Sequence, residues 1–467
     1  MAAQIRSVGV LGAGTMGHGI SEASALAGFD VTIYDVRQDF LDSGLEKIRW
    51  SVSKLEEKGV LSPGKGAVVL ARIHTTLDLH AMAKVDLIIE AVPEELSVKT
   101  EVFREIDREN KTAFLASNTS TIPITEIAAA TSRPQRFVGI HFFNPPVLMP
   151  LVEVIRGDLT DQETVDAAVS FSKALGKQVV LCRKDVPGFI VNRILGPLLN
   201  EAAWMVSRGQ ATVEQVDSAA VYKTGLPMGL LELADYTGID VIYKAAEAVK
   251  SREPAALSPA PLFGEKYRQG RLGKKAGEGF YSYGKPSGRP HITKEPGEGL
   301  DPLSFFCVAV NAAAWLVRNG VCSREDLDLA VQLGLGFPDG LLRMADRWGI
   351  DKVVAALKEK QGLYGDEYAP DLLLEEMVSS GSSGTAAGKG FYDYSTSEKK
   401  LDELILRKAP PLAWVSLNRP HRLNTITPTR TEELEAAAKD LSADGSIRVV
   451  VLSGEGGKAF SAGADLT

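Results

Sequence analysis

Residues 8–17 decide the fold of the first part of the chain, and they read Val-Gly-Val-Leu-Gly-Ala-Gly-Thr-Met-Gly. The apolar residues predict a strand that runs directly into three glycines at G-x-G-x-x-G spacing, after which a helix begins. Gly12 permits a tight turn, Gly14 lets the backbone approach a pyrophosphate, and Gly17 lets the helix pack close to the sheet. We therefore predict a dinucleotide site whose contacts are Gly12, Gly14, Thr15, Met16 and Gly17.

A second apolar run, residues 31–34, ends in Asp35. An acidic residue at the tip of the second strand, about 20 positions after the glycines, can accept hydrogen bonds from a ribose diol. Its charge repels a 2′-phosphate, which favours NAD over NADP, although the nearby Arg37 weakens this argument. An ordinary glycine turn is the alternative interpretation. The strand before the glycines, the helix after them and the acidic residue favour the nucleotide.

The composition is typical of a globular protein without a nucleic-acid partner. The chain has 467 residues, of which 45% are hydrophobic and 24% are charged, and this length predicts about three or four domains. A net charge of −8 and a pI of about 5.5 give no reason to expect nucleic acid. No apolar run reaches the ~18 residues that span a bilayer, and no signal peptide precedes the first strand, so we expect no membrane partner.

Cysteine and histidine usage indicates the compartment and argues against a metal site. Cys182, Cys307 and Cys322 are few and widely spaced, which is neither a disulfide framework nor a zinc pattern. None of the six histidines has a metal-ligand spacing supported by cysteines. We therefore expect a cytoplasmic protein that binds no metal.

Residues 1–185 alternate strand-like and helix-like segments. Buried-strand runs cover residues 85–92, 113–118 and 136–142, with helical patterns between them. Such alternation predicts an α/β fold with a doubly wound, mostly parallel sheet of the Rossmann type, which we assign to an NAD-binding domain. From residue 186 the strand signals disappear and helical periodicity begins, with Gly188 among the first helical residues.

The helical region contains an internal repeat with a constant offset of 111 residues. Three segments recur at this offset: residues 200–204 as 311–315, 225–229 as 336–340, and 279–283 as 390–394. The constant offset indicates duplication of one domain, so we predict copies at 186–294 and 295–405, with a linker over 284–299 between them. Two copies are too few for a solenoid. We interpret them as an internal pseudo-dimer, which makes a monomer plausible.

The last region, residues 406–467, changes character after Pro410-Pro411. A strand and turn over 412–420 and a strand over 448–452 flank a helical pattern at 431–441. The region then reaches a glycine turn. These elements are too short to bury a core of their own, so we predict an incomplete α/β segment.

Two titratable residues stand in apolar, strand-like runs. His141 lies at the end of its strand, where the carboxyl ends of a doubly wound sheet line the ligand crevice. An imidazole there can remove a hydroxyl proton while hydride leaves the same carbon for a nicotinamide. Glu153 follows twelve residues later. Because burial of a carboxylate is costly unless it is paired, we expect it to pair with His141. The alternative is a satisfied core histidine and a glutamate on an edge strand.

Two polar residues are further candidates. Ser120 follows a strand, and its hydroxyl could hydrogen-bond the reacting oxygen or simply cap a helix. Asn192 stands at the start of the helical region, and its amide could hold the same oxygen or be an ordinary polar residue on a helix face. Composition alone does not separate these alternatives.

Five motifs occur in one order: Gly12-Ala-Gly-Thr-Met-Gly17, Glu90-Ala-Val-Pro-Glu94, Ser117-Asn-Thr-Ser120, His141-Phe-Phe-Asn-Pro145 and Pro187-Gly-Phe-Ile-Val-Asn-Arg193. Together they resemble the 3-hydroxyacyl-CoA dehydrogenase family over residues 5–283, and the second helical copy extends the resemblance to residue 394. That family oxidises (S)-3-hydroxyacyl-CoA to 3-ketoacyl-CoA with NAD, in fatty-acid β-oxidation or a related pathway. The duplicated helical domain resembles the dehydrogenase part of multifunctional fatty-acid oxidation proteins.

The resemblance assigns catalytic roles to the polar candidates. It implies that His141 is the general base and that Glu153 is its partner. It implies that Ser120 and Asn192 bind the substrate by positioning its 3-oxygen and thioester region.

The resemblance further implies contacts with the two large ligands, NAD and acyl-CoA. It places Glu94 and Lys99 near the nicotinamide ribose. The helix that contains Lys54 matches the region that meets the CoA phosphates, without fixing which lysine does so.

The tail has a resemblance of its own. Residues 458–465, Lys-Ala-Phe-Ser-Ala-Gly-Ala-Asp, are similar to the first oxyanion-hole segment of the enoyl-CoA hydratase, or crotonase, family. In that family the amide after the glycine, here that of Ala464, helps to hold a thioester enolate. The second oxyanion amide and the catalytic glutamates come later there. We therefore expect a dehydrogenase–hydratase fusion that is cut inside its hydratase half and has no hydratase activity.

Two other functions stay open at this point. A different Rossmann oxidoreductase could act on a small hydroxy acid, but the helix around Lys54 and the pair of His141 with Glu153 favour a CoA substrate. A non-catalytic dinucleotide-binding or scaffold protein is the other alternative, and the presence of all four polar candidates argues against it. The sequence determines neither the preferred acyl chain length nor the direction of the reaction.

Overall fold

The computed structural model describes residues 5–284 and 288–465, which form two compact units, residues 1–341 and 342–467. Residues 285–287 of the predicted linker lie outside the described residues, as do both chain ends. In the described part of the chain, no helix combines the length and the apolar character needed to cross a membrane.

An eight-stranded sheet in the order β3-β2-β1-β4-β5-β6-β7-β8 organises the first part of the first unit. All neighbouring strands are parallel except β6 and β7, which are antiparallel. This confirms the predicted doubly wound, mostly parallel sheet. The strands are β1 (Ser7–Leu11), β2 (Asp30–Tyr34), β3 (Ile73–Thr76), β4 (Leu87–Glu90), β5 (Phe114–Ser117), β6 (Phe137–Phe142), β7 (Leu151–Ile155) and β8 (Gln178–Cys182).

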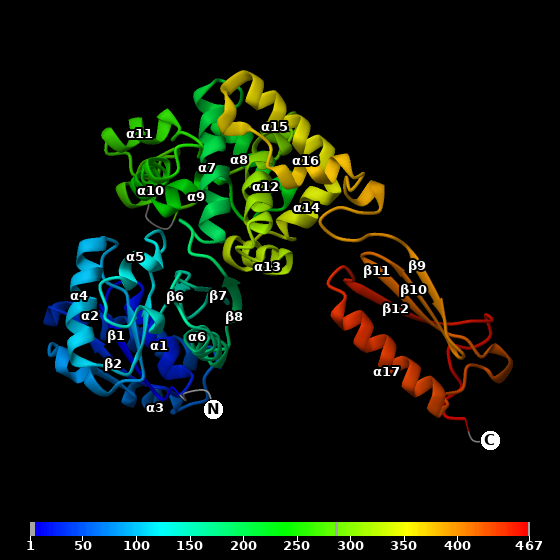
Figure 1. Ribbon diagram of the computed structural model, residues 1–467, viewed down its shortest axis with the longest axis horizontal. Coiled ribbons are helices and arrows are strands. Elements are labelled where there is room, and N and C mark those ends of the chain that lie inside the picture. The colour runs from blue at the N-terminus through cyan, green and yellow to red at the C-terminus, as the bar shows by residue number, and fades with distance from the viewer. Residues whose placement is uncertain (1–4, 285–287, 466–467) are drawn as a thin grey trace. The chain divides into compact units, whose positions relative to one another are not determined.

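Helices surround this sheet (Figure 1). The central strands β4, β5, β6 and β7 are buried along their whole length because they are covered on both faces. Val10, Ile89 and Val138 from three different strands have no exposed surface. The helices are α1 (Gly17–Leu26), α2 (Gln38–Glu57), α3 (Lys65–Ala71), α4 (Leu96–Glu109), α5 (Ile124–Ala128) and α6 (Gln162–Ala174).

The helical part of the first unit holds the first copy and the beginning of the second. The first copy comprises α7 (Val191–Ser207), α8 (Val213–Thr224), α9 (Leu230–Thr237), α10 (Ile239–Arg252) and α11 (Pro261–Arg268). The second copy begins with α12 (Leu303–Arg318) and α13 (Arg324–Leu335). Helices α7 and α12, which correspond at the offset of the repeat, pack against each other (Figure 1).

The contacts between the two copies are reciprocal. A Cβ atom on Gly225 would lie 3.2 Å from Pro338, and one on Gly336 would lie 2.9 Å from Pro227. The glycines correspond to each other in the repeat, and so do the prolines. The glycine of each copy therefore contacts the proline of the other copy. Such exchanged contacts are the pattern of an isologous dimer interface.

The prediction that helical structure begins at Gly188 is wrong by three residues. Gly188 and Phe189 have φ angles of 77° and 53°, which lie in the left-handed region, and α7 begins at Val191. A left-handed backbone cannot continue into a right-handed helix, so this turn separates the sheet domain from the helices. Phe189 is a bulky residue in a conformation that usually requires glycine, and it is fully buried.

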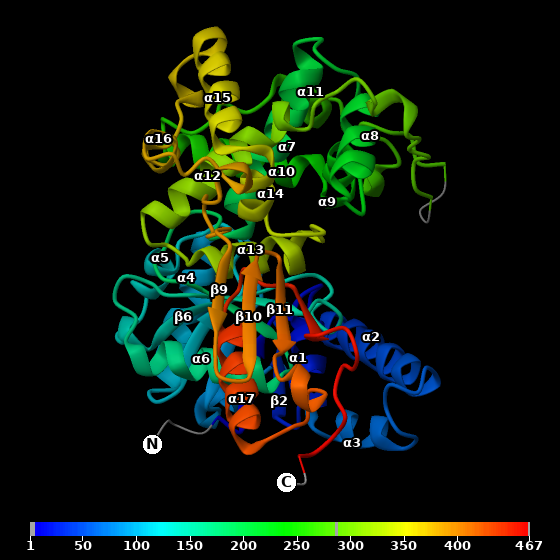
Figure 2. The same cartoon turned by 90° about the vertical axis from the view of Figure 1, so that its right-hand side faces the viewer.

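The second unit contains the remaining helices of the second copy and a small α/β segment. The helices are α14 (Leu341–Trp348), α15 (Ile350–Tyr364) and α16 (Leu372–Ser379). A four-stranded sheet follows in the order β12-β11-β10-β9, and α17 (Pro428–Ala443) lies along one of its faces (Figure 2). The strands are β9 (Ser397–Lys400), β10 (Leu404–Ala409), β11 (Leu412–Leu417) and β12 (Val449–Gly454).

The small sheet buries one face and exposes its β12 edge. Leu406, Val415 and Leu441 join α17 to the sheet in one apolar cluster. The four apolar residues at the start of β12, in contrast, are each at least 38% exposed: Val449, Val450, Val451 and Leu452. The pattern predicted β11, β12 and α17, but it did not predict β9 and β10.

Candidate functional site

The glycine turn after β1 forms a shallow cradle at the carboxyl ends of the parallel strands. Gly12 has a φ of +100°, and a Cβ there would lie 2.8 Å from the carbonyl oxygen of Ala91. A Cβ on Gly17 would lie 1.8 Å from the carbonyl oxygen of Gly12, so neither position admits a side chain. A Cβ on Gly14, in contrast, would meet nothing within 4 Å. The turn is closely packed at Gly12 and Gly17 but open at Gly14, which leaves the backbone of Gly14 accessible to a pyrophosphate.

The other predicted nucleotide contacts surround this cradle. Thr15 is exposed and Met16 is half-buried. Asp35 directly follows β2 and is buried, and its carboxylate accepts a hydrogen bond of 2.8 Å from the backbone N–H of Ala13. This bond ties the tip of β2 to the glycine turn. The chain therefore presents an accessible turn and a carboxylate together, as a bound dinucleotide requires.

His141 and Glu153 form a buried pair at the antiparallel junction of the sheet. They lie on adjacent strands as direct cross-strand partners of β6 and β7, so their side chains extend from the same face. The Nδ1 atom of His141 lies 2.7 Å from the Oε2 atom of Glu153. His141 is 5% exposed and Glu153 is 0% exposed. Because Nδ1 faces the carboxylate, Nε2 is the ring nitrogen left for a substrate.

The other carboxylate oxygen of Glu153 is held by the start of α7. Oε1 of Glu153 accepts hydrogen bonds from the backbone N–H groups of Ile190 and Val191, at 3.1 and 2.9 Å. The positive end of the helix dipole stabilises a carboxylate at this position. The left-handed turn at Phe189 directs these two amides toward the strand. The sheet domain and the first helical copy thus meet at Glu153.

Two phenylalanine rings enclose the imidazole of His141. The ring centroid of Phe143 lies 4.7 Å from that of His141, and the centroid of Phe189 lies 5.9 Å from it. Sequence reasoning did not select either phenylalanine as a site residue. Both stand in the motifs that carry the family resemblance, and this was the signal that could have identified them.

The structure also brings Ser120 and Asn192 together. The side-chain Nδ2 of Asn192 donates a hydrogen bond of 3.4 Å to the backbone carbonyl of Ser120. The backbone N–H of Ser120 donates to Oε1 of Glu94 at 2.8 Å. Thr119 donates its hydroxyl to the same oxygen at 2.7 Å. Glu94 therefore shapes the loop that presents Ser120, and α7 places Asn192 beside it.

Lys99 lies inside the protein, between two carboxylates. Its ammonium is 2.7 Å from Oε1 of Glu90 and 3.1 Å from Oε2 of Glu94. Burial raises the pKa of Glu90 despite the charge of Lys99. Burial alone would also raise the pKa of Glu94, but the charge of Lys99 and the hydrogen bond from Thr119 lower it below its ordinary value. Sequence reasoning missed Glu90, whose signal was a carboxylate within an apolar strand.

Lys54 and Ala464 are the remaining predicted site residues. Lys54 is in the last turn of α2, where its ammonium contacts Glu57 at 2.5 Å and remains partly exposed. Ala464 lies in the second unit and is exposed, and it forms an isolated parallel bridge with Ile426.

An apolar cavity of about 120 Å³ lies between the two helical copies. Its wall includes Leu195, one helical turn after Asn192 on α7. The remaining lining residues come from both copies: Leu226, Pro227, Met228, Leu230, Leu233, Leu335 and Phe337.

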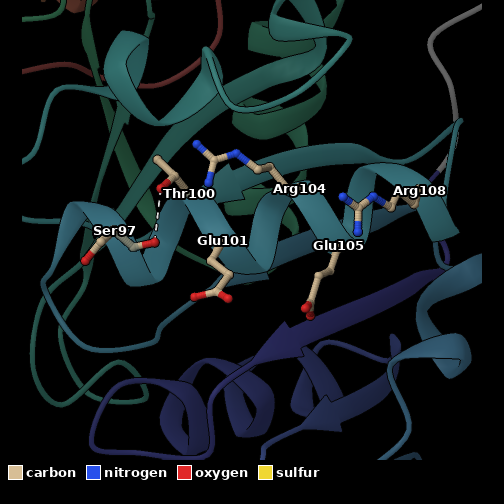
Figure 3. A pocket seen from close by; sticks show the side chains of 6 residues that line it. All are labelled: Ser97, Thr100, Glu101, Arg104, Glu105 and Arg108. Atoms are coloured by element: carbon tan, nitrogen blue, oxygen red, sulfur yellow. Dashed lines mark hydrogen bonds between the residues drawn. The ribbon is translucent and has the colours of Figure 1, made fainter.

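A second hollow lies on the outer surface of α4 and is polar (Figure 3). One helix supplies its entire lining, and none of the predicted site residues belongs to it. The lining residues are Ser97, Thr100, Glu101, Arg104, Glu105 and Arg108. Across residues 5–284 and 288–465, no three His, Cys, Asp or Glu side chains gather in a way that could hold a metal ion.

Comparison with known families gives matches to the sheet domain, to both helical copies and to the C-terminal segment. The NAD-binding domain of 3-hydroxyacyl-CoA dehydrogenase matches residues 7–186. The C-terminal domain of 3-hydroxyacyl-CoA dehydrogenase matches residues 188–283 and again residues 305–394. Enoyl-CoA hydratase/isomerase matches residues 408–467.

Individual relatives are similar to different shares of this chain. A probable 3-hydroxybutyryl-CoA dehydrogenase of Deinococcus radiodurans is 44% identical over 59% of this chain and 99% of its own length. The fatty acid oxidation complex subunit alpha of Shewanella amazonensis is 35% identical over 82% of this chain but only 56% of its own length. The crystal structure of 3-hydroxybutyryl-CoA dehydrogenase from Escherichia coli superposes with a TM-score of 0.73 at 28% identity, over 80% of this chain and 98% of that one.

Proposed function

This chain belongs to the 3-hydroxyacyl-CoA dehydrogenase family of NAD-dependent oxidoreductases, and from that premise we propose that it oxidises (S)-3-hydroxyacyl-CoA to 3-ketoacyl-CoA with His141 as general base. The single observation that supports this role best is the buried hydrogen bond of 2.7 Å between His141 and Glu153. It fixes the tautomer of the ring and leaves Nε2 for the 3-hydroxyl proton.

The surrounding residues support each part of this reaction. Glu153 stabilises the imidazolium that forms when His141 accepts the proton. Ser120 and Asn192 hold the 3-oxygen and the thioester region by hydrogen bonds that strengthen as the new carbonyl forms. The glycine turn and Asp35 would hold the dinucleotide, and Glu94 and Lys99 would lie near its nicotinamide ribose. NAD bound at the glycine turn would supply the acceptor for the hydride that leaves C3.

The apolar cavity favours an acyl substrate over a small hydroxy acid. A small hydroxy acid would fill only the polar part of the site, whereas an acyl chain could also occupy the cavity of about 120 Å³, whose wall includes Leu195 and contains no charged residue. Apolar cavities of ~150 Å³ hold a benzene ring, so this one can take a short stretch of acyl chain. On this proposal, α2 with Lys54 meets the CoA phosphates.

Residues 408–467 match enoyl-CoA hydratase/isomerase. We propose that Ala464 supplies the first oxyanion amide of a hydratase domain and that residues 406–467 alone do not hydrate enoyl-CoA. A single oxyanion donor without the catalytic carboxylates cannot hold and protonate an enolate. The dehydrogenase and hydratase steps would then belong to one fatty-acid oxidation protein.

Domain organisation, oligomeric state and compartment are also proposals. We propose four domains at residues 1–185, 186–294, 295–405 and 406–467. The reciprocal contacts between the copies satisfy within one chain the surface that would otherwise favour dimer formation, so we expect a monomer in sedimentation analysis. Cys182, Cys307 and Cys322 are free and buried, which agrees with a reducing cytoplasm.

Turnover of acetoacetyl-CoA tests the proposed function. Purified protein should consume NADH when acetoacetyl-CoA is added, and free CoA should inhibit the reaction. His141→Ala should lower kcat by about 10²–10⁴-fold, the contribution of a positioned acid–base group, while binding of NADH followed by its fluorescence is retained. A folded protein that consumes no NADH would exclude this function. Turnover at the normal rate by His141→Ala would exclude the role of His141.

A further inference from the structure

We propose that Gly334, in helix α13 of the second helical copy, is a positioning residue for His141. This inference rests on the proposed role of His141 as general base. The second copy contributes none of the polar residues assigned above. Nevertheless, α13 packs against β7 and β8 of the sheet domain, and β7 is the strand that carries Glu153.

The start of α13 is fixed to the sheet domain by two contacts of Arg183, which directly follows β8. The backbone N–H of Arg183 donates a hydrogen bond of 2.6 Å to the carbonyl of Val321. Its guanidinium lies 3.5 Å from the carboxylate of Asp326, in the first turn of α13. With its start held in this way, α13 cannot easily move away from the sheet.

Gly334 lies against three side chains that surround the His141–Glu153 pair. A Cβ at this position would lie 3.0 Å from Leu151, 3.2 Å from Val191 and 3.4 Å from Phe143. Leu151 shares strand β7 with Glu153, and the amide of Val191 holds the carboxylate of Glu153. The ring of Phe143 packs on that of His141.

A Cβ at position 334 would be tight against Leu151 and Val191 and in ordinary van der Waals contact with Phe143, so a side chain that extends beyond Cβ needs one of these three neighbours to move. Leu151 and Val191 are 1% and 0% exposed, so close packing holds both in place. Phe143 is only half-buried and is the neighbour with room to move. Because its ring centroid lies 4.7 Å from that of His141, its displacement reorients the imidazole. The absence of a side chain at Gly334 thus maintains the orientation of His141.

The repeat itself does not require this glycine. The matching position in the first copy is Lys223, whose ammonium donates hydrogen bonds to the carbonyls of Glu298 and Leu300. A long side chain is therefore compatible with the helical scaffold at this position. The difference between the copies follows from what each position faces: Gly334 faces the sheet domain beside His141.

Gly334→Val tests the proposal in the full-length chain. Overpacking here should lower kcat for acetoacetyl-CoA reduction by roughly tenfold, while KM for acetoacetyl-CoA and the Kd of NADH stay within about twofold, because neither ligand is assigned a contact with Gly334. The pH profile of kcat should shift as well, since the surroundings of His141 change. The matched control is Gly362→Val in α15, where a Cβ would meet nothing within 4 Å and no change in kcat is expected.

A second variant shows whether the effect passes through Phe143. In a Phe143→Leu background, which provides space, Gly334→Val should lower kcat by less than about threefold. An undiminished loss in that background, or an unchanged kcat in the single variant, would overturn the proposal. If the valine variant does not fold, Gly334→Ala can be compared in the same two backgrounds. Its kcat should be lower by about twofold to threefold in the chain with Phe143. Inactivity of the unmodified chain would instead refute the proposed function itself.

Discussion

The two helical copies can be compared position by position, because the offset of 111 residues holds along their length. Asp235 in the first copy accepts hydrogen bonds from the backbone amides of Phe280 and Tyr281 and from the hydroxyl of Tyr283. Asp346 in the second copy repeats all three contacts, which come from Phe391, Tyr392 and Tyr394. The same aspartate therefore holds the last residues of each copy by the same three hydrogen bonds.

The copies differ where α7 and α12 begin. Asn192 and Arg193 of the first copy correspond to Leu303 and Ser304 of the second. Asn192 lies beside Ser120, whereas Leu303 is 8% exposed and apolar. Duplication has thus preserved the residues that maintain the shape of the helical domain and retained the polar amide only where it reaches the sheet domain. We infer that the second copy has a packing role.

The largest effect on catalysis is expected when Asn192 of the first copy is replaced by leucine, the residue at the matching position 303 of the second copy. Asn192→Leu should lower kcat/KM for acetoacetyl-CoA by about 10²–10³-fold, as does loss of one donor to a developing oxyanion. Steady-state kinetics measures this loss, and Leu303→Met in the second copy, a swap that conserves volume, serves as the control. Equal losses from both variants would mean that the copies do not differ in function.

A smaller effect, on stability, is expected when the aspartate that occurs in both copies is replaced. We consider the substitutions Asp235→Asn and Asp346→Asn. An asparagine offers one acceptor oxygen in place of two, and its N–H₂ group faces a donor that the carboxylate now satisfies. Each substitution should therefore lower the free energy of unfolding by about 2–3 kcal/mol. Thermal unfolding followed by circular dichroism measures both variants. Because the two networks match contact for contact, the two losses should be similar, and a loss confined to Asp235→Asn would show that only one network stabilises its copy.

The smallest effect is expected at the reciprocal contacts. Gly225 and Gly336 end α8 and α13 with φ angles of 76° and 71°, and an alanine costs about 1 kcal/mol in that conformation. Gly336→Ala should cost slightly more, because its Cβ would lie 2.9 Å from Pro227 whereas that of Gly225 would lie 3.2 Å from Pro338. Denaturant unfolding of the two variants measures this difference. The reverse order would contradict the packing described here.

The sequence predicted the fold well where local pattern is sufficient. The glycine spacing, the apolar runs and the change from alternating to helical periodicity gave the α/β sheet and the helical region, and the structure confirms both. The backbone between Gly188 and Val191 was predicted wrongly because helical periodicity in side chains does not reveal a left-handed turn. The roles of His141, Glu153, Ser120 and Asn192 stay predictions, although the structure does bring these residues together in pairs.

The glycine turn, the repeat and the order of the motifs can be identified from the residues alone, because they depend on neighbouring residues and on spacing along the chain. Which distant groups meet follows from how the chain folds. The register of β6 with β7 places His141 opposite Glu153, the end of β4 places Glu90 on Lys99, and the packing of α13 places Gly334 against Phe143. Such contacts depend on strand pairing and helix packing across the chain, and local pattern contains no record of either.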